Sequence, residues 1–514
     1  MTTNKQGSGL DRRDFLKGFA SATVAAGLVG PGEVLAKGQS GPPGVPPGQF
    51  GRELLAPPRI SGRPTGEAYW HRVRQAFSLA DDYIHMNTGT TGSPPEFVLN
   101  NLAVYNRYKA ADPLSWSANL AAEAPALFPI SPSATGARQA MVAAVYGANA
   151  DEIVLSYNTT DACNLIFAGT PWKPGDRIVT TSFEHPALAG PIAWARDYHG
   201  VEVVVVDIPS NFTEDMTVDE VLGWFESALE APLAQGGEKK YLAISEIFYK
   251  NGLRMPIPEL CELARMHRAF SIVDSAHGWG MLPIDCHGYG ADFIAGAGHK
   301  WLCGGPGTGI LYVRTSDADV YPLPPFAMGN FFLYGNPFVA PSSWYESRAW
   351  NPGVYMQFRG ESNTPAVYAM TDALSFFDQV GVHSIYERGI ALGNHLKGLI
   401  AGQWGRDALW VQENRDARFA TALTCFNPFA SRNDAASFAV MRDAINAIVN
   451  GLAGETPKIY IRSVTWRSSK FALADDRIGF RISTHGVYNS YDEVDYVFGR
   501  LVDHIARSGL RQST

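Results

Sequence analysis

The stretch from residue 241 to residue 277 reads YLAISEIFYKNGLRMPIPELCELARMHRAFSIVDSAH and contains a complete strand–helix–strand unit. Residues 241–245 and 270–273 are short apolar runs, and residues 258–267 between them show a helical pattern. Continuous apolar runs are typical of strands that are covered on both faces, and a helical connection joins parallel strands. This unit therefore predicts a parallel sheet with helices packed on it.

The same alternation continues on both sides of this unit. Further strands are expected at residues 153–156, 178–181, 201–206, 292–295 and 309–313, with helices at 161–168, 186–198 and 217–229. Together these segments predict an α/β fold with a mainly parallel seven-stranded sheet. Beyond about residue 365, long helices alternate with a few strands, which favours a smaller C-terminal α/β domain. We expect an N-terminal segment of the small domain at 67–95, the large domain at 96–345 and the small domain at 346–514.

Composition excludes several classes of protein. The chain has 514 residues, 46% of them hydrophobic and 12% aromatic, which is enough for two or three packed domains. A net charge of −8 argues against binding to nucleic acid or to an acidic membrane surface. The five cysteines are odd in number and form no C-x-x-C pair, which argues against a disulfide scaffold and a structural metal site. No apolar run is long enough for a stable membrane span.

The N-terminus has the features of an export signal. Residues 10–18 read LDRRDFLKG, an apolar stretch follows at 19–29, and Val34-Leu-Ala36 fits a cleavage site. The adjacent arginines are similar to a bacterial twin-arginine signal peptide, here residues 1–36, although a chance pair on a frayed terminus is the alternative. We expect the twin-arginine translocation machinery to export the protein to the periplasm or the medium. Residues 37–66, rich in Gly and Pro, are expected to form a flexible leader.

Polar residues follow the predicted strands at the edge of the sheet where α/β proteins bind ligands. After the first strand, Thr159 and Thr160 open a helix, where free N–H groups and two hydroxyls can bind phosphate. Thr160 or Asp161 could instead be an ordinary N-cap. His185 stands at the next strand–helix junction, where a lone histidine can also be purely structural.

Two further residues complete a recognisable set. Asp274 ends a buried strand, so its carboxylate needs a partner, a helix cap or a salt bridge. Lys300 lies in the glycine-rich stretch 296–309 and is a candidate imine-forming amine, unless it is a surface lysine in a mobile loop. Pyridoxal 5′-phosphate requires a phosphate site, a carboxylate that keeps its pyridine nitrogen protonated and a lysine that holds its aldehyde. This set of residues therefore predicts that cofactor.

The chain also resembles the class V aminotransferases, in the branch of isopenicillin N epimerase-like proteins and cysteine desulfurases. The resemblance runs from about residue 83 to residue 501 and is carried by His85-Met-Asn-Thr-Gly-Thr-Thr-Gly, Asn158-Thr-Thr-Asp-Ala-Cys-Asn, Glu184-His185, Val273-Asp-Ser-Ala-His277, His299-Lys-Trp and Phe480-Arg-Ile-Ser483 with Tyr488-Asn489. It implies fold type I, with a large domain that binds the cofactor, a small domain, and a homodimer with shared active sites.

The resemblance implies roles for the matched residues. Lys300 would form the imine, Asp274 would pair with the pyridine nitrogen, His277 would bond the ring hydroxyl, His185 would stack on the ring, Thr159, Thr160 and His299 would bind phosphate, and Arg481 with Asn87 would bind the substrate carboxylate. A salt bridge on the strand face is the alternative for Arg481. The chain departs from the family at Ala297, where a phosphate-binding Ser is common, at Gly360-Glu361 in place of Gly-Thr, and at 245–252, which lacks the usual His or Asn near the ring.

The site residues that the resemblance implies are shared by epimerase, aminotransferase and lyase chemistry, so they do not distinguish these reactions. Desulfuration also needs a nucleophilic cysteine in the loop before the Arg481 strand, but residues 426–514 contain none. Cys425 lies in an apolar strand pattern that predicts burial, and Cys303 is expected to pack in the interior. We therefore expect an enzyme that acts on an amino acid or related amine by epimerase- or aminotransferase-type chemistry at Cα. A C–S or β-lyase, or a non-catalytic exported binding protein, are the alternatives.

Overall fold

A computed structural model describes residues 53–117, 134–315, 352–357 and 361–513. The predicted signal peptide and residues 37–52 of the predicted leader lie outside the described residues, so export by the twin-arginine route stays a prediction. No helix in the described ranges combines the length and the apolar character that crossing a bilayer requires.

The larger part of the molecule is built on a seven-stranded sheet with the strand order β2-β8-β7-β6-β5-β3-β4. Its strands are β2 (Ile153–Ser156), β3 (Arg177–Thr181), β4 (Glu202–Val206), β5 (Lys240–Ser245), β6 (Ala269–Asp274), β7 (Phe293–Ala297) and β8 (Gly309–Val313). β8 runs antiparallel to β2 and β7, and every other pair is parallel. The prediction of a mainly parallel seven-stranded sheet is confirmed.

Helices cover both faces of this sheet, which explains why its strands are apolar along their whole length. One face packs on α7 (Thr159–Gly169) and α8 (Pro186–His199), and the other on α9 (Val218–Glu230) and α10 (Ile257–Met266). Successive strand residues point to opposite faces of the sheet. The side chain of Tyr241 in β5 therefore packs in the apolar cluster on the side of α7 and α8, and that of its neighbour Leu242 packs in the cluster on the side of α9 and α10. A capping box formed by Thr217 and Glu220 is present at the start of α9.

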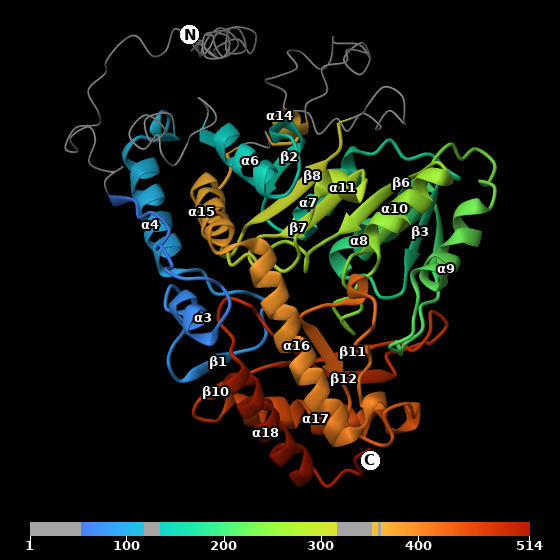
Figure 1. Cartoon of the computed structure of the whole chain (residues 1–514). Helices are drawn as coiled ribbons and strands as arrows, with labels where there is room; N and C mark the ends of the chain where they lie inside the picture. Colours follow the sequence, from blue (N-terminus) through green and yellow to red (C-terminus); the bar gives the residue numbers. More distant parts are fainter. Residues whose placement is uncertain (1–52, 118–133, 316–351, 358–360, 514) are drawn as a thin grey trace, which may run out of the picture.

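The C-terminal part forms a second, smaller α/β unit, as predicted. Its antiparallel sheet has the order β11-β12-β9, with β9 (Leu423–Phe426), β11 (Arg462–Trp466) and β12 (Arg477–Ser483). The helices α16 (Val382–Trp404), α17 (Phe438–Ala453) and α18 (Tyr491–Arg507) pack with it around one apolar core. Figure 1 shows this unit, in orange and red, below the larger sheet.

The N-terminal segment crosses from one unit to the other. β1 (Tyr83–His85) pairs in parallel with β10 (Lys458–Tyr460) of the C-terminal unit. After a short link, α4 (Glu96–Ala111) packs against α15 (Thr364–Val380), beside the larger sheet (Figure 1). Residues 86–95 therefore run between the two units.

A buried ion pair joins three helices at this side of the molecule. Asp372 on α15 accepts hydrogen bonds from Tyr105 Oη at 2.7 Å and from Asn101 Nδ2 at 2.9 Å, both on α4. It also forms an ion pair with Arg138 on α6 (Ala134–Val145), and both side chains are buried. A buried carboxylate is stable only when it is paired in this way, so the network requires all three helices to be in place.

We expect Asp372→Asn to lower the free energy of unfolding by about 3–5 kcal/mol, because it removes the carboxylate that forms an ion pair with the buried Arg138. Denaturant unfolding of the purified protein measures the loss. The matched control is Glu361→Gln, because Glu361 also forms an ion pair, with Lys109, but its side chain is 84% exposed. This variant should lose less than about 1 kcal/mol of the free energy of unfolding. Equal losses in the two variants would contradict a stabilising role for the buried pair.

Candidate active site

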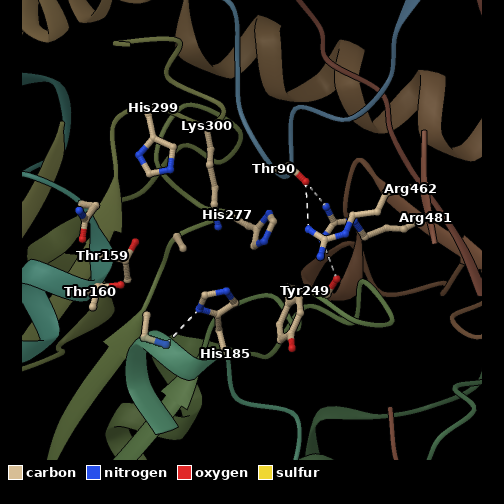
Figure 2. Close-up of a pocket in the computed structure, with 14 residues that line it drawn as sticks. Thr90, Thr159, Thr160, His185, Tyr249, His277, His299, Lys300, Arg462 and Arg481 are labelled. Atoms are coloured by element: carbon tan, nitrogen blue, oxygen red, sulfur yellow. Dashed lines mark hydrogen bonds between the residues drawn. The ribbon is translucent and has the colours of Figure 1, made fainter. Parts of the chain in front are cut away.

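A cavity of about 270 Å³ lies where the carboxyl ends of the parallel strands face the smaller unit (Figure 2). Its walls come from the N-termini of α7 and α8, the turn after β7, the segment after β1, and the strands β11 and β12. The residues that line it are Gly89, Thr90, Asn158, Thr159, Thr160, His185, Ala187, Tyr249, Ala276, His277, His299, Lys300, Arg462 and Arg481.

One end of the cavity is suited to an anion. Asn158 is the N-cap of α7, because its side chain accepts the Asp161 N–H at 2.9 Å. Neither Thr160 nor Asp161 is therefore the cap, and the hydroxyl of Thr159 is buried without a hydrogen-bond partner among the described residues. Figure 2 shows Thr159 and Thr160 at the end of the cavity away from the arginines. Free N–H groups and hydroxyls at a helix N-terminus attract phosphate.

His185 lies at the start of α8 as a neutral ring. Its Nδ1 accepts the N–H of Ala187 at 3.1 Å, so its proton lies on Nε2. Burial, followed by the charge of Lys300, lowers the pKa of His185 to about 4. A neutral imidazole held in this orientation offers a flat face to an aromatic ring in the cavity.

His277 presents a single donor to the cavity. Its Nδ1 accepts the Nε1–H of Trp301 at 3.0 Å, which leaves the proton on Nε2. Burial, followed by the charge of Lys300, lowers the pKa of His277 and keeps the ring neutral. The Nε2 atom is buried without a partner among the described residues. The arrangement is complete only when a ligand supplies an acceptor there.

Asp274 ends β6 directly beneath the cavity wall. Its Oδ1 accepts the N–H of Ala276 at 2.9 Å, and its side chain is almost fully buried. Burial raises the pKa of Asp274, and the charge of Lys300 opposes that rise. No ion pair joins Asp274 to any residue in the described part of the chain, so neither alternative that we weighed, a helix cap or a salt bridge, accounts for its burial.

Lys300 lies in the turn that follows β7, and its amine faces the cavity (Figure 2). Burial lowers its pKa to about 8, Asp274 opposes the shift, and Arg481 and Arg462 add to it. The turn is held from the other side by Gly92, whose N–H donates to the His299 carbonyl at 2.8 Å. A Cβ at position 92 would lie 2.1 Å from the Lys300 carbonyl oxygen, so only glycine allows this contact.

Arg481 reaches the opposite end of the cavity from β12. It donates to the Tyr249 carbonyl at 3.0 Å, the Asn87 Oδ1 at 3.2 Å and the Thr90 Oγ1 at 2.9 Å. Its Nε has no hydrogen-bond partner and no carboxylate pairs with it within the described ranges. The alternative of a salt bridge on the strand face is therefore not observed, and the guanidinium is available to a ligand carboxylate.

The structure brings the predicted site residues together. Thr159, Thr160, His185, His277, His299, Lys300 and Arg481 line the cavity, while Asp274 lies behind Ala276 and Asn87 lies behind Arg481. Sequence reasoning missed Arg462, Thr90 and Tyr249. Thr90 lies within the 85–92 motif and Tyr249 within 245–252, and both segments take part in the comparison with the family. No motif contains Arg462, which only its strand register places at the site.

Two of the residues at which the chain departs from the family pattern, Ala297 and Glu361, lie outside the lining of the cavity. Ala297 is fully buried at the end of β7, and Glu361 is exposed and pairs with Lys109. Gly360, the neighbour of Glu361 in that motif, lies outside the described residues. Neither Ala297 nor Glu361 lines the cavity.

The chain is similar to known proteins over most of its length. Residues 85–497 match the family described as Aminotransferase class-V. Isopenicillin N epimerase of Streptomyces clavuligerus is 26% identical over 348 residues, which cover 66% of this chain and 81% of the epimerase. A probable cysteine desulfurase of Halobacterium salinarum is 28% identical over 322 residues, which cover 59% of this chain and 68% of that protein.

Solved structures share the fold. An apo cysteine desulfurase from Thermococcus onnurineus NA1 superposes with a TM-score of 0.60 at 20% identity, covering 89% of this chain and 100% of the desulfurase. A mutant of the protein C-DES, solved with glycine covalently linked to its PLP cofactor, also gives 0.60 at 18% identity, covering 84% of this chain and 99% of that one. The cofactor of this chain is pyridoxal 5′-phosphate.

The residues of the cavity fit this cofactor. Thr159 Oγ1 and His277 Nε2 are buried polar atoms without partners among the described residues, at positions suited to a phosphate and to a ring oxygen. Asp274 is a buried carboxylate without an ion pair in the described ranges, which suits a protonated pyridine nitrogen. Lys300 supplies an amine whose pKa is lowered to about 8.

We expect the cofactor-free protein to be loaded faster as the pH rises. Only the neutral amine of Lys300 reacts, and its pKa of about 8 places the midpoint near that pH, with a plateau above it. Growth of visible absorbance after addition of the cofactor measures the rate, and borohydride reduction with peptide mapping identifies the lysine. A loading rate that continues to rise until the pH reaches the ordinary pKa of lysine would contradict the lowered value. Label on another lysine would contradict the assignment of Lys300.

Proposed function

We propose, because the chain belongs to the class V aminotransferases, that it acts on an amino acid or related amine by moving the proton at Cα, as an aminotransferase or an epimerase. One observation carries the proposal: the cavity brings a lysine amine and an unpaired arginine together, without a thiol. The amine serves the proton transfer, and the arginine serves the substrate carboxylate.

When bound, pyridoxal 5′-phosphate supplies an electron sink that acidifies the Cα–H bond of an amine attached to it. The N-terminus of α7, with Thr159 and Thr160, would bind the phosphate together with His299. His277 would donate from Nε2 to the ring oxygen, and Asp274 would hold the proton on the pyridine nitrogen. Lys300 would hold the cofactor until substrate arrives.

Lys300 is the base that the cavity offers near neutral pH. Burial lowers the pKa of the three histidines that line the cavity, which makes them weak bases, and raises the pKa of Tyr249, which keeps its hydroxyl protonated. The two arginines stay charged. Among the described residues that line the cavity, Lys300 Nζ therefore carries the proton alone. A single base suits aminotransferase chemistry, in which one proton leaves and returns on one face, better than epimerisation, which needs a donor on each face.

The cysteines argue against sulfur transfer, although several relatives are cysteine desulfurases. All five cysteines are described and buried, and none lines the cavity. Cys425 lies opposite Arg481 on β9, and burial raises the pKa of its thiol. Cys303 is likewise buried, as expected from the sequence. A buried, protonated thiol is a poor nucleophile, so persulfide formation has no obvious acceptor here.

Exchange of the Cα proton with solvent tests the proposal directly. We expect deuterium from deuterated water to enter Cα of the amino acid substrate, with retention if Lys300 acts alone and with inversion if the enzyme is an epimerase. Mass spectrometry and chiral chromatography measure both outcomes across a panel of amino acids and oxo acids. Pyruvate and ammonia as the only products would favour a β-lyase. No spectral change with any amine would favour a binding protein.

Asp274→Asn should lower the rate of this exchange by about 100-fold or more, because the pyridine nitrogen then loses the carboxylate that keeps it protonated. The variant should still fold and bind the cofactor, since the amide oxygen can accept the Ala276 N–H. Circular dichroism and cofactor absorbance check both conditions. A near-native exchange rate in a loaded variant would mean that Asp274 has a structural role only.

A further inference from the structure

Two arginines stand side by side at one end of the cavity. Arg462 on β11 and Arg481 on β12 occupy directly opposite positions in the antiparallel pair, so their side chains leave the same face of the sheet. Both donate to the same hydroxyl: Thr90 Oγ1 lies 3.3 Å from Arg462 Nη1 and 2.9 Å from Arg481 Nη2. Figure 2 shows the two guanidinium groups beside Thr90.

Their charges are not neutralised within the described part of the protein. The groups that accept hydrogen bonds from them are an amide, a hydroxyl and a carbonyl, all of them neutral. The residues that line the cavity include three cations, Lys300, Arg462 and Arg481, and no Asp or Glu. Like charges directly opposite each other on paired strands are destabilising unless an anion lies between or beside them.

The cofactor phosphate and the substrate α-carboxylate would neutralise only part of the positive charge of the cavity. The cofactor phosphate would belong at the N-terminus of α7, at the other end of the cavity, and Asp274 would pair with the pyridine nitrogen. The α-carboxylate of the substrate would occupy Arg481, which is fully buried and has a free Nε. Arg462 is more exposed and lies at the cavity wall, so it is placed to bind a group further from Cα.

We propose that the substrate carries a second anionic group on its side chain and that Arg462 binds it. The simplest substrates with a second anionic group are acidic amino acids, and an acidic peptide-like amine carries the same groups. This inference rests on the proposed function, because it reserves Arg481 for the α-carboxylate. Arg462 would then determine specificity by its charge, without taking part in the proton transfer.

Matched pairs of amino acids that differ by one charge test the inference. Glutamate and glutamine, and aspartate and asparagine, are titrated into the holoenzyme, and dissociation constants are read from the visible spectrum. We expect the acidic member of at least one pair to bind about 10-fold or more tightly. Arg462→Gln should weaken binding of that acid by about 10- to 100-fold and change the amide by less than about 3-fold, while Arg462→Lys restores part of the loss.

Arg442→Gln is the matched control, because Arg442 is an exposed arginine of α17 that pairs with Asp443 and does not line the cavity. It should leave all four constants unchanged. Equal affinities for acid and amide in the wild type, or an Arg462→Gln variant that keeps the preference, would overturn the inference while the proposed function stands.

A second measurement separates this inference from the proposed function. Glutarate has two carboxylates and no amine, so it can bind without reacting, and butyrate is its singly charged counterpart. We expect glutarate to raise the melting temperature of the wild-type holoenzyme more than butyrate does, and Arg462→Gln to abolish the difference. If no amino acid changes the spectrum, the proposed function fails, and this measurement alone decides the inference. The absence of any difference between glutarate and butyrate would then overturn it.

Discussion

The contact between Gly92 and the Lys300 turn is the constraint on which the cavity depends. The N–H of Gly92 donates to the His299 carbonyl at 2.8 Å, at a separation that no side chain at position 92 would allow. The same segment begins at β1, which pairs with β10 in the smaller unit. This backbone contact thus connects the turn that follows β7 to the smaller unit. Together with other contacts between the units, such as that of Arg481 with the Tyr249 carbonyl, it brings the lysine from one unit and the arginines from the other to a common space.

Burial then decides the charge of each group in that space. It lowers the pKa of the histidines and of Lys300 and raises that of Asp274, in every case towards the neutral form. The two arginines lie at one end of the cavity, while the other end offers the N–H groups of α7. The cavity is therefore prepared for anions at both ends and for a flat ring between them. This arrangement suits a phosphorylated cofactor and an amino acid better than it suits an uncharged amine.

The comparison with cysteine desulfurases shows how far the fold restricts the reaction. The chain shares its fold with solved cysteine desulfurases, and a shared fold can serve different reactions. The outcome depends on which further groups reach Cα or the side chain. In this chain the cysteines are buried and Arg462 stands beside Arg481, and the reaction type and the substrate class are proposed from these two features. Relatives with different named activities, an epimerase and a probable cysteine desulfurase, are similar to this chain at comparable identity.

The sequence alone determined the seven strands, since apolar runs such as that of β5 are local and a doubly covered sheet demands them. It also placed Thr159, Thr160, His185, Asp274 and Lys300 at one edge of the sheet, because residues that follow parallel strands gather there. The family resemblance, and not the strand pattern, predicted His277, His299, Arg481 and Asn87. Contacts between distant segments were decided only by tertiary structure. Arg462 reaches the cavity through its register opposite Arg481, and the tautomer of His277 depends on Trp301 across the turn. Periodicity carries no information on such pairings, because they follow from how separate elements pack and not from the pattern within any one of them.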